Sequence, residues 1–190
     1  GEVAQDISRG LARVAVAGQV DGETVDLMHS LNDDCQVNIL TFDDIEGKKA
    51  FWHTSAHIMA QAVKRLFPHI KLAIGPSIDN GFYYDFDTDK PFTPEDLDSI
   101  EAEMSKIVKE NLELERFELP RQEAIEYMAR ENESYKVELI QDLPEDSEIS
   151  FYRQGEFVDL CAGPHISSTG KVRAFKLLSL AGAYWRGDEK

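Results

Sequence analysis

The stretch Phe51-Trp52-His53-Thr54-Ser55-Ala56-His57 lies within residues 48–67, where apolar side chains recur at steps of three and four. This spacing predicts a helix with one buried stripe. His53 and His57 are four residues apart, so both imidazoles lie on the same side of that helix, one turn apart. They are offset by roughly 100° from the apolar stripe, and we therefore expect them to line the wall of a cleft.

A second pair with the same spacing, Cys161 and His165, occurs in the segment DLCAGPH at residues 159–165. Its Gly-Pro step favours a turn over a helix, and such a turn can point both side chains the same way. Strand alternation over residues 157–161 places Asp159 on the same face as the cysteine. One such pair alone is usually ordinary surface or core. Two pairs of zinc-binding or proton-transferring residues indicate a shared site.

The composition is that of a globular chain with 42% hydrophobic and 29% charged residues. A length of 190 residues fits one ordinary domain plus a small one. No apolar run is long enough to span a membrane, and no signal peptide is evident. Two cysteines make no disulfide framework, so we expect a cytoplasmic location. A first residue other than Met suggests a piece of a longer protein.

The net charge is −16, and the charged residues are unevenly distributed along the chain. The total argues against broad electrostatic binding of nucleic acid, because phosphate contacts need Lys and Arg. Acidic residues are concentrated between residues 93 and 149, whereas basic residues outnumber them from residue 150 onward. We expect any nucleic acid to approach the second region.

Local patterns predict two units, residues 1–42 and 43–190. In the first, a helix over 7–14 precedes strands over 13–20 and 35–42, with Asp21-Gly22 as a hairpin turn. In the second, Asn80-Gly81 predicts a hairpin, and one of Tyr83 and Tyr84 should face the cleft. Further elements are expected as a helix from Thr93, a strand at 112–119, a helix at 121–129, paired strands at 149–153 and 157–161, and closing strands at 175–178 and 183–187.

As fold class we therefore expect α+β: a small β-grasp-like fragment followed by a mixed sheet with flanking helices. The cleft should lie between the helix of His53 and the sheet of Cys161. Lys136 is surrounded in sequence by acidic residues, and such a lysine is usually a solvated charge.

Five ordered blocks resemble the N-terminal region of bacterial-type threonyl-tRNA synthetases. They are HTSAH at 53–57, AIGPSIDNGFYYD at 73–85, ESYK at 133–136, DLCAGPH at 159–165 and LAGAYWRGD at 180–188. Residues 1–42 resemble a truncated TGS module, which is ubiquitin-like. Residues 43–190 resemble the editing domain, the second additional domain of threonyl- and alanyl-tRNA synthetases.

The resemblance implies hydrolysis of the ester of serine wrongly attached to threonine tRNA, in support of threonylation by the full-length enzyme. Serine lacks only threonine's methyl group, which is worth about 1–3 kcal/mol in a pocket, so binding alone leaves errors. By the same resemblance the catalytic residues are His53, His57, Lys136, Cys161 and His165. Tyr84 and Asp159 would bind substrate.

We expect the region of His53 and Cys161 to activate a water, Lys136 to stabilise the oxyanion or the leaving ribose hydroxyl, and Asp159 to bind the serine amine. A nucleophilic Cys161 is the less favoured role. The resemblance implies that editing needs no metal. ATP, a catalytic zinc and the dimer interface would belong to a core that follows residue 190, and the partner would be the acceptor end of threonine tRNA, with no membrane.

Two alternatives remain open. Two His, a Cys and a further His could hold zinc, as in the related alanyl-tRNA editing domains. The chain could instead be a non-catalytic module that orients tRNA. A His-Glu-x-x-His protease is disfavoured because Thr54 occupies the position of the glutamate.

Overall fold

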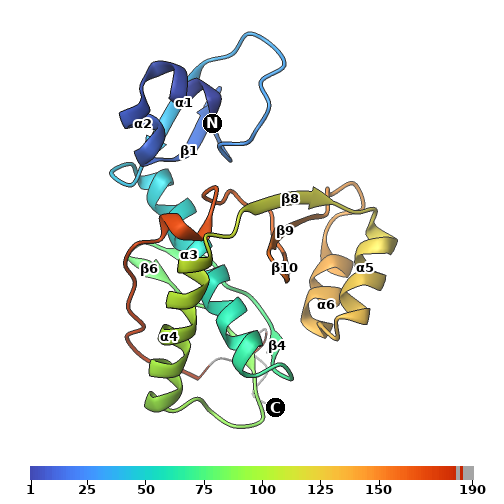
Figure 1. Cartoon of the computed structure of the whole chain (residues 1–190). Helices are drawn as coiled ribbons and strands as arrows, with labels where there is room; N and C mark the ends of the chain where they lie inside the picture. Colours follow the sequence, from blue (N-terminus) through green and yellow to red (C-terminus); the bar gives the residue numbers. More distant parts are fainter. Residues whose placement is uncertain (183–184, 186–190) are drawn as a thin grey trace.

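The computed structural model describes residues 1–182 and Trp185, and its first unit is a three-stranded antiparallel sheet covered by two short helices (Figure 1). The strand order is β2-β1-β3. Asp21 and Gly22 both have positive φ angles, 50° and 93°, which confirms the predicted hairpin turn. These elements are α1 (Glu2–Ile7), α2 (Arg9–Val14), β1 (Ala15–Val20), β2 (Glu23–Val25) and β3 (Val37–Thr41).

The helix expected over residues 7–14 is present as α2, but it begins only at Arg9, because the chain is extended at Ser8; the separate helix α1 before it was not predicted. The Ser8 hydroxyl accepts a hydrogen bond from the Leu11 backbone N–H at 3.0 Å. This hydrogen bond is an N-cap, and it fixes the start of α2.

Helix α3 (Ile45–Leu66) runs through the centre of the molecule and carries His53 and His57 (Figure 1). Every residue from Thr54 to Val63 is buried, so the helix is covered on all sides along its middle. The predicted single stripe is therefore too narrow, whereas Leu66, the last residue of the helix, is 38% exposed. Small side chains at Ala56, Ala60 and Ala62 allow this close approach by neighbouring elements.

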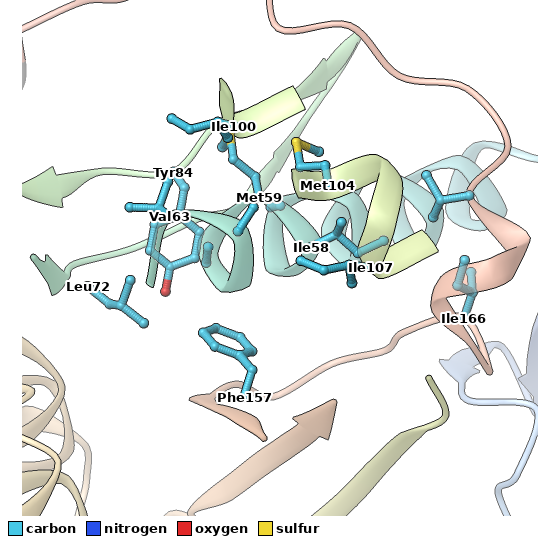
Figure 2. Packing of buried hydrophobic residues seen from close by; sticks show 14 of the residues in the cluster. Ile58, Met59, Val63, Leu72, Tyr84, Ile100, Met104, Ile107, Phe157 and Ile166 are labelled. Carbon is cyan, nitrogen blue, oxygen red and sulfur yellow. The ribbon is translucent and has the colours of Figure 1, made fainter. Parts of the chain in front are cut away.

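Helix α4 (Pro94–Glu110) packs along α3, and together they form the main core (Figure 2). It begins with a capping box, in which the Thr93 hydroxyl accepts from the Asp96 N–H and the Asp96 carboxylate accepts from the Thr93 N–H. The fully buried residues of this core include Ile58, Val63, Met104, Ile107 and Ile166.

The second sheet is antiparallel, in the order β10-β9-β8, and helices α5 and α6 pack beside it (Figure 1). Gly155 supplies the positive φ of the β9–β10 turn, and the register places Asp159 opposite Tyr152. The elements are β8 (Leu114–Glu118), α5 (Arg121–Arg130), α6 (Ser134–Asp142), β9 (Ser150–Gln154) and β10 (Phe157–Leu160).

The α+β class is confirmed, but small antiparallel sheets replace the expected mixed sheet. Residues 71–87 form only two-residue strands, among which β5 and β6 make the predicted hairpin, but its turn is Asp79-Asn80 and Gly81 begins β6. These strands are β4 (Lys71–Leu72), β5 (Ser77–Ile78), β6 (Gly81–Phe82) and β7 (Phe86–Asp87). A short 3₁₀ helix, η1 (Thr169–Lys171), follows the second sheet.

The closing strand expected at residues 175–178 is wrong. The carboxylate of Glu101 accepts hydrogen bonds from the Leu177 N–H at 2.6 Å and from Lys176 at 2.7 Å, so a side chain on α4 takes the place of a neighbouring strand. Of the other expected closing strand, 183–187, all but Trp185 lies outside the described residues. None of the helices in the described part of the chain has the length and apolar character needed to cross a membrane.

The main hydrophobic core extends across both predicted units, although the first unit also has a small cluster of its own. Val16 and Leu40 of the first unit belong to the same buried cluster as Ala50 and Ile58 of α3. The Lys171 ammonium also donates to the Ala15 carbonyl at 2.8 Å. The division at residue 42 stays a prediction, since packing is continuous across it.

Arg65, near the end of α3, lies among three carboxylates, those of Glu103, Glu110 and Glu156. The hydrogen bond from Arg65 lowers the pKa of Glu156 from 4.5 to about 2. A lowered folded-state pKa stabilises the fold above about pH 4.5, and this contribution is lost as the pH falls towards 2.

We expect Arg65→Met to reduce the free energy of unfolding at pH 7 by about 1 kcal/mol or less, because these groups are partly exposed. The difference from the unsubstituted chain should shrink between pH 4.5 and pH 2, as measured by urea unfolding. Lys49→Met, which removes the exposed pair with Glu46, is the control. A difference in the free energy of unfolding that does not change with pH would show that Arg65 does not lower the pKa of Glu156.

Candidate functional site

The two predicted pairs meet. The Cys161 sulfur lies 3.2 Å from Nε2 of His53 and 3.2 Å from Nε2 of His165. The ring of His57 is 4.2 Å from that of His165 and 5.2 Å from that of His53, centre to centre. His57 and His165 are buried, whereas His53 is half-buried. His53 is thus the imidazole of the cluster nearest to the surface.

The turn after β10 directs Cys161 and His165 towards α3. Ser150 on β9 holds its start, because the Ser150 carbonyl accepts from the Cys161 N–H at 3.0 Å and its hydroxyl donates to the Cys161 carbonyl at 2.8 Å. Gly163 has a φ of 78° and its backbone N–H donates to the Cys161 sulfur at 3.2 Å. A Cβ at this glycine would lie 2.2 Å from the Tyr152 hydroxyl oxygen, so the turn requires glycine.

Thr54 sets the proton position on His165. The Thr54 hydroxyl donates its one hydrogen to the Ala50 carbonyl at 3.0 Å and accepts from the Ile166 N–H at 3.1 Å. Its oxygen is also 3.0 Å from Nδ1 of His165, which must therefore carry the proton. The Nε2 lone pair of His165 consequently faces the thiol.

The imidazole of His53 also presents a lone pair to the thiol. It hydrogen-bonds to the backbone of Pro164, which has no N–H, so the histidine donates there. Since Nε2 faces the sulfur, Nδ1 is the donor. One S–H hydrogen can be donated to only one of two imidazoles, and one basic nitrogen is left to accept another proton or to bind a metal ion.

Behind the histidines lies a buried charged group made by Lys136, Asp159 and Tyr84. The Lys136 ammonium is 2.7 Å from Oδ1 of Asp159 and donates to the Tyr84 hydroxyl at 3.0 Å. That hydroxyl donates to Oδ2 of Asp159 at 2.5 Å. Lys136 is 3% exposed, so its interpretation as a solvated charge is wrong. Tyr84 is buried and Tyr83 is 39% exposed, as the alternation predicts.

Burial determines the protonation of this site. It lowers the pKa of His57 to about 3, lowers that of His53 and holds that of His165 well below its ordinary value. Burial also raises the pKa of Cys161 to about 12. For Asp159, burial would raise the pKa, but Lys136 and His57 outweigh it and lower the pKa. At neutral pH the site therefore holds neutral imidazoles, a thiol and a carboxylate paired with an ammonium group.

The four ligand atoms of His53, His57, Cys161 and His165 lie within 4.8 Å of one another, so they could hold a metal ion. Imidazole nitrogen with thiolate sulfur is a donor set that zinc prefers. Nδ1 of His57 is buried and has no hydrogen-bond partner within residues 1–182 and Trp185. The donor chemistry thus fits zinc as well as proton transfer.

Comparison with known proteins supports the resemblance. Residues 1–41 match the TGS domain, and residues 149–190 match the threonyl and alanyl tRNA synthetase second additional domain. The chain is similar throughout to the N-terminal region of bacterial threonine–tRNA ligases. The predicted resemblance is confirmed.

The identities to three such ligases are high, and each covers the whole chain. They are 68% over 189 residues for Acetivibrio thermocellus, 64% over 189 for Caldanaerobacter subterraneus and 66% over 189 for Clostridium botulinum. The chain spans only 29–30% of the length of these relatives.

Three residues that contact the site were missed by the sequence analysis. Thr54 could have been noticed, because it lies between the two histidines on α3. Tyr152 could have been found from the β9–β10 register, which places it opposite Asp159. Asp26, which accepts from the His165 N–H at 2.7 Å, is 139 positions away from it and gives no local signal.

Thr54→Val should destabilise the chain by about 1–3 kcal/mol for each buried polar group left without a partner, with little change in volume. The groups affected are Nδ1 of His165 and the Ile166 N–H. Urea unfolding measures the loss. Ser55→Ala is the matched control, since that hydroxyl donates only within α3, to the Phe51 carbonyl. Equal losses in the two variants would contradict the role of Thr54.

Proposed function

We propose that this chain is a proofreading hydrolase that removes serine from threonine tRNA by attack of water on the seryl ester. The observation that carries the proposal is the basic imidazole nitrogen that the thiol cannot satisfy, together with the buried Lys136–Asp159 pair behind it. The similarity to threonine–tRNA ligases gives the substrate class. In the full-length enzyme this activity would support accurate threonylation.

His53 is the proposed general base. Its pKa is lowered, so it is neutral and able to accept a proton, and it is more exposed than the other two histidines. The imidazole takes a proton from water as the oxygen bonds to the ester carbon. Collapse of the tetrahedral intermediate then breaks the bond to the ribose oxygen, which receives the proton. The products are serine and a free terminal ribose hydroxyl.

Asp159 is the proposed partner of the serine ammonium group, with Tyr84 as its support. Both carboxylate oxygens already contact protein groups, Lys136 at one and Tyr84 at the other. In this proposal an incoming ammonium group exchanges with that of Lys136 at Oδ1. The released lysine is then available to stabilise the negative oxygen of the intermediate, and binding and charge stabilisation become coupled.

Cys161 positions groups in this mechanism and does not attack. A pKa of about 12 keeps it as a thiol, whereas nucleophilic attack needs the thiolate. It lies between His53 and His165 and receives the Gly163 N–H, so its sulfur fixes the spacing of the two imidazoles. The ring of His57 lies 4.2 Å from that of His165 and 6.0 Å from that of Phe157, centre to centre, and we infer that these rings exclude the additional methyl group of threonine.

The chain should hydrolyse seryl-tRNA(Thr) faster than threonyl-tRNA(Thr) by roughly tenfold to two-hundredfold, the discrimination expected of one methyl group. His53→Gln should reduce the rate by roughly a hundredfold or more while leaving tRNA affinity unchanged. Release of labelled amino acid measures the rate, and filter binding measures the affinity.

His69→Ala is the matched control, because this histidine is exposed and lies outside the cluster. Cys161→Ala should keep part of the activity. Complete loss in Cys161→Ala, with a serine thioester trapped on the unsubstituted chain, would replace the water mechanism by a nucleophilic one. Binding of tRNA without any hydrolysis would favour the non-catalytic orienting module.

A zinc-dependent deacylase is the second candidate, favoured by the four convergent ligand atoms. Bound zinc would supply an activated water, and the chain's own residues would hold the metal and orient the ester. A chelator should leave seryl-tRNA hydrolysis unchanged if His53 is the base. Loss on chelation and recovery with added zinc would favour the metal-dependent reaction.

The proposed partner is the acceptor end of threonine tRNA, approaching the basic C-terminal region. Arg153 and Arg173 are exposed there, on either side of the Cys161 turn in sequence. The cytoplasm is the proposed location, because two unpaired cysteines suit a reducing compartment.

A further inference from the structure

Asp26 links the first unit of the chain to the Cys161–His165 turn. It follows strand β2, and each of its carboxylate oxygens accepts one hydrogen bond from the second unit. Oδ1 accepts from the His165 backbone N–H at 2.7 Å, and Oδ2 accepts from the Tyr152 hydroxyl at 2.5 Å. The carboxylate thus binds the turn and the strand behind it at the same time.

Both donors depend on this carboxylate. Tyr152 is 2% exposed, so its hydroxyl is removed from solvent and requires a protein acceptor. The His165 N–H belongs to a turn and has no strand partner in the described part of the chain. Hydrogen bonds to a charged acceptor are shorter and stronger than neutral ones, which suits the task of fixing a turn.

The two bonds fix the position of His165 relative to α3. The Tyr152 ring lies 4.3 Å from the His165 ring, and its hydroxyl sits where a side chain on Gly163 would be. Without Asp26, the backbone at His165 loses one of its anchors, and only Thr54 still holds the histidine from the α3 side. The backbone of the turn at His165 would then be held less firmly, although the contact between His165 and the Cys161 sulfur remains.

We propose that Asp26 is a positioning residue for ester hydrolysis, so that the TGS-like unit completes the editing site. This inference rests on the proposed function. Asp26 does not touch the substrate; it acts through the His165 backbone and through Tyr152. A misplacement of about 1 Å in a reacting group can reduce a rate by roughly a hundredfold.

The test compares Asp26→Ala with Asp26→Asn in the whole chain. The alanine variant should lower kcat for seryl-tRNA(Thr) by roughly tenfold to a hundredfold with KM nearly unchanged, because chemistry and not binding is affected. The asparagine variant should recover most of kcat, since its oxygen can accept from His165 and its amide can donate to the Tyr152 oxygen. Asp21→Asn is the matched control, because Asp21 accepts only the Gln36 N–H within the first unit.

An independent readout separates this inference from the proposed function. The His165 amide proton should resonate downfield in NMR spectra of the unsubstituted chain and move upfield in Asp26→Ala, whether or not the chain hydrolyses any ester. A chain that shows this shift and does not hydrolyse seryl-tRNA would overturn the proposed function. A chain that hydrolyses it with equal kcat in Asp26→Ala would overturn the positioning role.

Tyr152→Phe tests the positioning role of Asp26 if the Asp26→Ala variant does not fold. This variant removes one of the two bonds and leaves no cavity. A several-fold lower kcat at unchanged KM supports the positioning role. An unchanged kcat in Tyr152→Phe would contradict the positioning role. A folded Asp26→Asn variant without measurable hydrolysis would contradict it too.

Discussion

The enclosure of helix α3 is the constraint on which the rest of the structure depends. Ten consecutive residues, Thr54 to Val63, are removed from solvent, so each polar group among them needs an internal partner. Thr54 and Ser55 donate to carbonyls one turn earlier, and Gln61 exchanges hydrogen bonds with Gln154 of β9. The same enclosure removes water from the histidines. Their low pKa values, and the high pKa of Cys161, are consequences of how the helix is packed.

The charged group of Lys136, Asp159 and Tyr84 has a different relation to stability. Burying an ammonium group and a carboxylate costs free energy, because both ions lose their hydration. Their mutual attraction offsets this cost only when the geometry is good. Packed apolar side chains would fill this space as well. A buried ion pair 3.6 Å from an imidazole nitrogen of His57 therefore fits the proposed chemistry better than a purely structural role.

Local sequence patterns predicted those features that depend on neighbouring residues. The helix around His53, the helix that starts at Thr93, the turn at Asp21-Gly22 and the hairpin of β5 and β6 were all predicted, because spacing and turn chemistry are sufficient to specify them. Two of the failures have their cause in long-range contacts. Glu101 replaces a strand partner for residues 176–177, and burial of Lys136 depends on Asp159 from another element. For the site, the histidine and cysteine pairs were evident in the sequence, whereas the residue that anchors their turn was not.

The turn that carries Cys161 and His165 is held from three separate parts of the chain. Ser150 fixes its start to the second sheet, Thr54 fixes His165 to α3, and Asp26 fixes the His165 backbone to the first unit. Each anchor belongs to a different part of the chain from the turn, so no single element can form the site. A reactive cluster assembled in this way exists only after the core shared by the two units has formed. The position of the site at this junction thus makes its geometry depend on the folding of the whole chain.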